Sequence, residues 1–99
     1  MNDCLFCKIA AGEIPSTKVY EDETTLAFRD IAPQAPVHVL VIPKKHVSGW
    51  YDAQSESDEM LAHLMRVAAQ VAKSEGIVDS GFRVVSNCGD DAQQTVKHL

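Results

Sequence analysis

The sequence predicts an α+β fold in which one long helix packs against an antiparallel sheet. Short runs rich in β-branched and aromatic residues alternate with polar breaks, as they do in hairpins. One longer run, 55–75, repeats apolar side chains every three or four positions, which is the period of an amphipathic helix. Strands and helices do not alternate as in βαβ units, so hairpin connections are expected. The pattern predicts two helices and four or five strands in a single domain over residues 1–99.

The first predicted element is a short N-terminal helix. Asp3 is a residue type that caps helix N-termini, and Gly12 is one that ends helices. Apolar side chains at helical spacing give this segment one face that can be buried. That face comprises Leu5, Phe6, Ile9 and Ala10.

Three strands are expected next. Residues 17–21 and 24–29 flank a short polar break and therefore predict a hairpin. Residues 37–42 form an apolar, largely β-branched run between two prolines, which indicates a strand buried on both faces. Residues 30–36, which contain two prolines, are expected to form an ordered loop.

The long helix over 55–75 has recognisable ends. Ser55 and Ser57 are alternative N-caps, and Gly76 is a suitable terminator. His63 falls outside the apolar face and is expected to be a solvated surface histidine. The apolar face consists of Leu61, Leu64, Met65, Ala68, Val71 and Ala72.

The C-terminal part predicts further strands around a polar loop. Residues 81–87 return to a strand pattern, with apolar side chains at Phe82, Val84 and Val85. Residues 88–95 are polar and predict a loop, and residues 96–99 have the pattern of the start of one more strand.

Length and charge exclude several function classes. The chain of 99 residues carries 9 basic and 14 acidic side chains, a net charge of −5. Binding many nucleic-acid phosphates requires clustered excess positive charge, so no nucleic-acid partner is expected. The longest apolar run, 39–42, is far shorter than the ~20 residues of a membrane span, and no secretory signal pattern is visible. We therefore expect no membrane partner and a cytoplasmic protein.

The cysteines and two histidines are candidate metal ligands. The spacing of Cys4 and Cys7 lets two thiolates reach one metal ion, and it also suits a redox pair or two small side chains on a short helix. Adding His46 and His98 gives a possible Cys2His2 set, whose wide spacing is a weak signal by itself. Cys88 has no partner in the sequence and is expected to be a free thiol.

Other polar residues could contact a nucleotide. Asp30 follows a predicted strand, where a carboxylate can accept hydrogen bonds from ribose hydroxyls or simply form a turn. Asn87 and the loop 89–95 offer amide and hydroxyl donors that suit a phosphate, or they form a surface turn. His38 begins the apolar strand, where a structural role is favoured.

Several segments, in order, make the chain similar to the histidine-triad (HIT) family, in its nucleotide-binding phosphoramidase (HINT-like) branch. The resemblance covers nearly the whole chain, and its most recognisable part is the strand and turn from Val39 to His46. The segments that carry it are 4–9, 12–15, 26–31, 33–38, 39–46, 82–87 and 94–96.

The resemblance implies a five-stranded antiparallel sheet, with its last strand incomplete here, and a homodimer. It also implies a pocket for a purine nucleoside 5′-monophosphate or its conjugates. By position, Asp30 would bind the ribose, Phe6 and Ile31 would line the base pocket, and Asn87 and Thr95 would surround the phosphate.

Some proteins that this chain resembles hold a structural zinc ion. The positions of their ligands correspond here to Cys4, Cys7, His46 and His98. The resemblance therefore favours zinc as a structural cofactor over the other interpretations of the cysteine pair.

The family is named for the pattern His-φ-His-φ-His-φ-φ, with φ apolar, in which the middle histidine attacks phosphorus and forms a nucleotidyl-histidine. His98 corresponds to the first histidine, so the nucleophile would follow Leu99 and no catalytic residue is assigned within the chain. We therefore expect the domain over 1–99 to be C-terminally incomplete. Gln93 stands where the family pattern has glycine, so it is expected to crowd the phosphate loop.

Two functions follow from these expectations. The first is a nucleoside phosphoramidate or nucleotidyl hydrolase that acts through a nucleotidyl-histidine, of which this chain is an incomplete copy. The alternative is a catalytically silent, zinc-stapled nucleotide-binding or sensor module. A purely structural dimerisation protein is less favoured, because a scaffold role does not require Asp30 or the phosphate loop.

Overall fold

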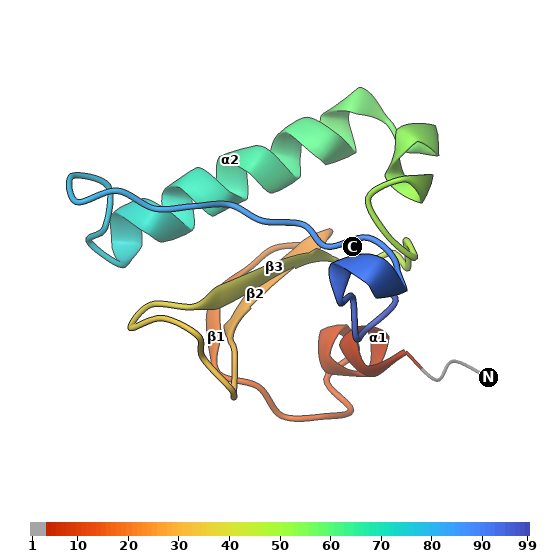
Figure 1. Cartoon of the computed structure of the whole chain (residues 1–99), viewed down its shortest axis with the longest axis horizontal. Helices are drawn as coiled ribbons and strands as arrows, with labels where there is room; N and C mark the ends of the chain where they lie inside the picture. The colour runs from red at the N-terminus through yellow and green to blue at the C-terminus, as the bar shows by residue number, and fades with distance from the viewer. Residues whose placement is uncertain (1–3) are drawn as a thin grey trace.

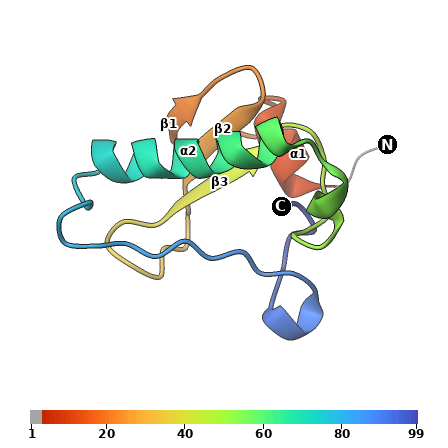
Figure 2. The ribbon, with the colours of Figure 1, turned by 90° about the horizontal axis from the view of Figure 1, so that it is seen from above.

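The computed structural model describes residues 4–99, which form a small sheet with a helix on each face (Figure 1). The long helix lies over one face of the sheet, and the short helix lies on the other side (Figures 1 and 2). No helix among the described residues is both long enough and apolar enough to cross a bilayer. In chain order the elements are α1 (Leu5–Ala10), β1 (Lys18–Glu21), β2 (Thr25–Arg29), β3 (Val39–Pro43), the 3-10 turn η1 (Asp52–Ser55), α2 (Asp58–Ser74) and the 3-10 turn η2 (Asp90–Ala92).

The sheet is antiparallel, with the order β1-β2-β3. The pairing of β2 with β3 runs without interruption from Thr25 opposite Pro43 to Arg29 opposite Val39. The pairing of β1 with β2 shifts register between Lys18 and Tyr20. The hairpin and the third strand predicted from the sequence are therefore confirmed.

Side chains of β2 alternate between the two faces, as a strand requires. Because both faces are covered, four of its five residues are buried. The third strand also contributes to both layers, since Ile42 packs toward α1 while Val39 and Val41 pack toward α2. The buried cluster toward α1 consists of Ile9, Leu26, Phe28 and Ile42. The cluster toward α2 consists of Ala27, Val67 and Val71.

The helix α2 begins after Ser57, whose hydroxyl accepts a hydrogen bond from the Met60 amide at 3.1 Å. Ser57 is therefore the N-cap, and Gly76 ends the helix with a φ of +72°. The predicted apolar face was partly wrong, because Met65 is 76% exposed whereas Val67 is 1% exposed. Residues that are two positions apart in an α-helix lie about 200° apart around its axis. Burying Val67 therefore turns Met65 toward solvent.

Both ends of α2 are tied to the hairpin by polar contacts. The Arg29 guanidinium donates two hydrogen bonds to the Glu75 carboxylate, at 2.6 and 3.0 Å. Near the other end, His63 Nε2 lies 2.6 Å from Asp22 Oδ2. His63 is therefore half-buried and paired, and its predicted role as a solvated histidine is corrected.

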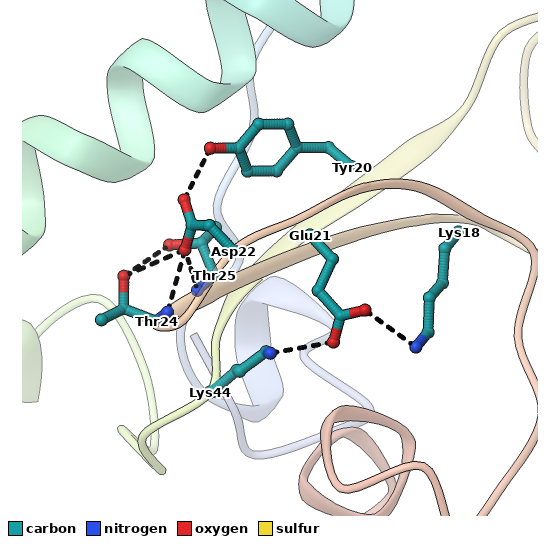
Figure 3. A network of polar contacts seen from close by, with 7 residues as sticks. All are labelled: Lys18, Tyr20, Glu21, Asp22, Thr24, Thr25 and Lys44. Atoms are coloured by element: carbon teal, nitrogen blue, oxygen red, sulfur yellow. Dashed lines mark hydrogen bonds and ion pairs between the residues drawn. The ribbon is translucent and has the colours of Figure 1, made fainter.

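Asp22 organises the turn between β1 and β2 (Figure 3). Its Oδ1 accepts hydrogen bonds from the Thr24 and Thr25 amides, both at 2.9 Å, and its Oδ2 accepts one from the Tyr20 hydroxyl at 2.6 Å. Beside it, Glu21 accepts from two lysines, Lys18 at 2.9 Å and Lys44 at 2.8 Å (Figure 3). These contacts explain how a short polar break holds two strands in register.

The five-stranded sheet is corrected to three strands within residues 4–99. Residues 81–88 and 96–99 have no strand conformation. Residues 82–88 exchange no backbone hydrogen bond with other described residues, and Val84 and Val85 are 71% and 60% exposed. A strand is stabilised by its ladder of backbone bonds and by a buried face, and residues 81–88 lack both. Alternating residue types predict only that a segment favours extended backbone.

Candidate metal centre and nucleotide-binding residues

The ligand atoms of all four predicted metal ligands lie within 4.8 Å of one another. Three separate parts of the chain supply them: the start of α1, the turn after β3 and the C-terminal segment. The four residues are Cys4, Cys7, His46 and His98. The fold thus gathers ligands that are separated by up to 94 positions in the sequence.

The two cysteines come together through the first turn of α1. The predicted N-cap Asp3 lies outside the described residues, and Cys4 takes the N-cap position. The Cys4 Sγ accepts a hydrogen bond from the Cys7 amide at 3.4 Å. Since residues three apart face the same side of a helix, the C-x2-C spacing places both sulfurs toward the turn after β3.

The sulfur–nitrogen distances match a tetrahedral site. Cys4 Sγ lies 3.2 Å from His98 Nδ1, and Cys7 Sγ lies 3.2 Å from His46 Nδ1 and 3.4 Å from His98 Nδ1. A tetrahedral ion with metal–sulfur bonds of ~2.3 Å and metal–nitrogen bonds of ~2.0–2.1 Å separates its S and N ligands by about 3.5 Å. The donor set and its spacing therefore fit one ion that prefers thiolate and imidazole.

His98 is held so that Nδ1 faces the sulfurs. The residue is 3% exposed, and Nε2 lies 2.7 Å from the Pro43 carbonyl oxygen, to which it donates its proton. Burial lowers the pKa of His98, the bond to Pro43 partly opposes this, and the nearby His46 lowers it further. A neutral ring with its proton on Nε2 leaves a lone pair on Nδ1, which is the form that binds metals.

The predicted base-pocket residues lie in different environments. Phe6 on α1 is partly buried, and its ring contacts those of Phe28 and His98 at centroid distances of 5.6 and 5.9 Å. Ile31, in contrast, is 99% exposed at the start of the loop after β2. Through Phe6, the four candidate metal ligands are in continuous contact with the hydrophobic core between α1 and the sheet.

The predicted ribose acid, Asp30, lies directly beyond the end of β2. Its Oδ1 accepts a hydrogen bond from the Ala32 amide at 2.8 Å, and its Oδ2 lies 3.4 Å from His38 Nε2. His38 was expected to be structural, and its partner could not be foreseen, because the pairing depends on the register of β2 with β3.

The predicted phosphate residues Asn87 and Thr95 are exposed on either side of η2. The loop between them is anchored by Gln94, which sequence reasoning did not single out. Its side chain donates to the Ser48 carbonyl at 2.8 Å and accepts from the Gly89 amide at 2.8 Å. Gln94 directly precedes Thr95, a predicted phosphate residue, and this position is the only feature of the sequence that could have indicated the role of Gln94.

Gln93 adopts a left-handed backbone conformation, with a φ of +61° and a ψ of +36°. Glycine reaches this conformation without steric penalty, whereas other L-residues are disfavoured there by roughly 1–2 kcal/mol. The unusual glutamine therefore occupies a position whose backbone favours glycine.

A shallow cavity of about 360 Å³ lies beside this loop. Its lining includes Ser48, Asp52, Cys88, Gly89 and Lys97. None of the five predicted nucleotide residues lines it, and no hydrogen bond within residues 4–99 links Asp30 to the loop around η2. The assignment of these five residues remains a prediction.

All four histidines of the chain contact another side chain. His46 and His98 contact the two cysteines of the candidate metal centre, His38 faces Asp30, and His63 pairs with Asp22. None of them lines the cavity beside η2.

Comparison with known proteins gives consistent matches. The HIT domain matches residues 11–99 of the chain. A solved structure described as a histidine triad protein from Clostridium difficile is 52% identical, with a TM-score of 0.94, over 100% of this chain and 86% of that chain. A HIT family hydrolase from Legionella pneumophila Philadelphia 1 is 49% identical, with a TM-score of 0.93, over 97% of this chain and 86% of that chain.

A plant protein is similar over the same length. The 14 kDa zinc-binding protein of Brassica juncea is 48% identical over 99 residues, which cover 98% of this chain and 87% of the plant protein.

Proposed function

The chain belongs to the HIT domain family, and from this membership we propose that residues 4–99 bind a purine nucleoside 5′-monophosphate group beside one structural zinc ion. The family membership makes the chain hydrolase-like. The phosphoramidase chemistry, the nucleotide and the zinc belong to the proposal. The single observation that carries it is the Asp30 carboxylate, half-buried and held by a backbone amide at the end of the sheet.

The zinc assignment is supported by the ligands. Two thiols and two imidazoles within 4.8 Å form a Cys2His2 donor set. A relative that is 48% identical is named as a zinc-binding protein. Bound zinc would link the start of α1, the turn after β3 and the C-terminal segment, and so stabilise the fold. Such thiols stay reduced in the cytoplasm, which is the proposed location.

The nucleotide assignment is supported by Asp30 and by the loop around η2. A carboxylate at a strand end accepts hydrogen bonds from ribose hydroxyls. The loop has positive φ at Gly89 and Gln93, a backbone form that occurs in phosphate-binding loops. The amides of these two residues donate within the loop, to the Gln94 side chain and to the Asp90 carbonyl. We propose that Phe6 and Ile31 contact the base and that Asn87 and Thr95 contact the phosphate.

For the reaction, we propose hydrolysis of a nucleoside phosphoramidate through a nucleotidyl-histidine. In this route a histidine nitrogen bonds to phosphorus as the P–N bond to the amine breaks, and the amine takes up a proton and leaves. Water then displaces the histidine nitrogen and releases the nucleoside monophosphate. None of the four histidines is assigned as the nucleophile, because each is engaged elsewhere. A second candidate is a nucleotide-binding or sensor module that is held together by zinc and binds without turnover. The Cys2His2 set and Asp30 support it equally.

The zinc proposal is tested by measuring metal in the purified chain. We expect one zinc per chain, and a Cys7→Ser variant should lose it. Cys88→Ser is the matched control, because Cys88 is an exposed thiol outside the cluster. A folded protein without metal after zinc exposure would contradict the proposal, as would full zinc content in Cys7→Ser.

The nucleotide proposal is tested by calorimetric titration with AMP and by incubation with adenosine 5′-phosphoramidate. Binding should weaken about ten-fold or more in Asp30→Asn, because a charged acceptor is lost. Asp79→Asn, an exposed acid beyond α2, is the control. Amine release by the chain would support the hydrolase, whereas binding without release would support the silent module. Absence of AMP binding would refute both.

We also propose that the chain forms a homodimer. The exposed apolar side chains of Phe82, Val84 and Val85 support a protein partner on this segment. Sedimentation should give a dimer for the native chain and a monomer for Val84→Asp. A native chain that sediments as a monomer at micromolar concentration would contradict this.

A further inference from the structure

The loop around η2 is docked on the turn that follows β3. The Gln94 side chain is half-buried, and its Nε2 donates to the Ser48 carbonyl at 2.8 Å. Beyond the loop, the Leu99 amide donates to the Val47 carbonyl at 2.7 Å. Two successive carbonyls of this turn therefore hold the loop and the segment that follows it.

Gln94 also fixes the shape of the loop from within. Its Oε1 accepts from the Gly89 amide at 2.8 Å, and its own backbone amide donates to the Gly89 carbonyl at 3.0 Å. The Ser48 carbonyl can only accept and the Gly89 N–H can only donate, so one orientation of the side-chain amide satisfies both. A donor and an acceptor are thus both used at the end of this one side chain.

Gly49 is the surface on which this amide packs. It is buried, and its carbonyl accepts from the Ala53 amide at 3.1 Å. A Cβ at this position would lie 3.4 Å from both Nε2 and Oε1 of Gln94 and 3.2 Å from the Cys88 sulfur. Unlike Gly89, Gly49 does not have a positive φ, so its backbone would accept alanine. The close approach of the loop is what leaves no room for a side chain here.

We propose that Gln94 is a positioning residue for the nucleotide phosphate and that Gly49 is required for its contact with the turn. Together they hold the loop so that Asn87 and Thr95 reach one phosphate group. Thr95 directly follows Gln94, and Asn87 directly precedes Cys88, so a shift of this contact moves both. This inference rests on the proposed nucleotide-binding function and adds two residues that act through the loop rather than on the ligand.

Two variants disturb the contact from opposite sides. Gln94→Met keeps an unbranched side chain of similar length and removes both of its hydrogen bonds. Gly49→Ala keeps both partners and adds a Cβ against the loop. Cys88→Ala removes the atom nearest to that Cβ, so the double variant Gly49→Ala/Cys88→Ala relieves the crowding. Gln54→Met, at an exposed glutamine on η1, is the matched control.

The readout is the ratio of the affinities for AMP and adenosine, measured by calorimetry, because these ligands differ only in the phosphate. We expect the ratio to fall about five-fold in Gln94→Met and about three-fold in Gly49→Ala, while the affinity for adenosine is kept. Cys88→Ala, Gln54→Met and the double variant should keep the native ratio. A purely structural role would change the free energy of unfolding without changing this ratio.

A native ratio in either Gln94→Met or Gly49→Ala would overturn the proposal, and Gly49→Ala provides this test even if Gln94→Met does not fold. A double variant whose ratio stays as low as that of Gly49→Ala would also overturn it, since crowding of the loop would not be the cause. Failure of the native chain to bind AMP would refute the proposed function and this inference together. AMP binding that is no tighter than adenosine binding would refute this inference alone.

Discussion

Replacing Asp22 by Asn should destabilise the protein, because this carboxylate links the β1–β2 turn to α2. Its Oδ2 lies 2.6 Å from both the Tyr20 hydroxyl and His63 Nε2. The Oδ1 acceptor for the turn amides is preserved in Asn, so the loss is confined to Oδ2. There an NH2 group would meet the Nε2–H of His63.

The magnitude follows from the two bonds that change. Hydrogen bonds to a charged group contribute about 1.5–3 kcal/mol each. The Tyr20 hydroxyl can rotate and accept from the new amide, and the Asp22 side chain is 27% exposed, so part of the loss is recovered through water. We expect the free energy of unfolding to fall by about 2 kcal/mol at pH 7.

The pH dependence provides an independent check. Partial burial raises the pKa of Asp22, but hydrogen bonds from Tyr20, Thr24, His63 and Thr25 outweigh it and hold the pKa well below its ordinary value of 3.8. A depressed folded-state pKa contributes stability that is fully present above the unfolded-state value. That stability is lost as the pH falls through the folded-state value. The advantage of wild type over Asp22→Asn should therefore shrink below pH 3.8.

The assay is urea unfolding followed by circular dichroism at pH 7 and at steps down to pH 3. Wild type and Asp22→Asn contain the same cluster of cysteines and histidines, so titration of that cluster cancels in the difference between their free energies of unfolding. Glu23→Gln is the control, because this neighbouring exposed acid makes no hydrogen bond among the described residues. A difference below about 0.5 kcal/mol at pH 7, or one that grows on acidification, would refute the reasoning.

Three further changes have defined outcomes. Leu26→Ala should lower the free energy of unfolding by about 2–5 kcal/mol, because Leu26 is fully buried. Leu5→Ala, at a residue that is 43% exposed, should lower it by less than about 1 kcal/mol. Equal losses in urea unfolding would contradict the placement of Leu26 in the core. Gln93→Gly should be about 1 kcal/mol more stable than Gln93→Ala, because only glycine adopts a φ of +61° without steric penalty. Equal free energies of unfolding in urea would exclude the left-handed backbone conformation at residue 93. Zinc should raise the melting temperature of the native chain but not of Cys7→Ser, as followed by calorimetry with added zinc, and an equal rise in both would place the ion elsewhere.

Local patterns were reliable where the chain itself determines the structure. The apolar run 37–42 predicted a strand buried on both faces, and the packing of β3 on α1 and α2 confirms this. Gly76 as terminator was correct, and of the two N-cap candidates Ser57 begins α2 whereas Ser55 lies in the preceding 3-10 turn. Sequence patterns predicted the wrong structure where a segment would have to pair with a strand that is distant in the sequence. Residues 81–88 favour extended backbone, but a strand also requires a ladder with a neighbour, which a local pattern does not encode.

The sequence by itself predicted the α+β class, the resemblance to the HIT family and the four Cys and His residues whose side chains the fold brings together. Those conclusions depend on residue types and on their order. Only the tertiary structure decided that Cys4 and His98, 94 positions apart, bring their ligand atoms to 3.2 Å, and that His98 presents Nδ1 because the Pro43 carbonyl accepts the proton on Nε2. It also decided the partners of His38 and His63. Such contacts depend on strand register and helix rotation, which follow from how the whole core packs.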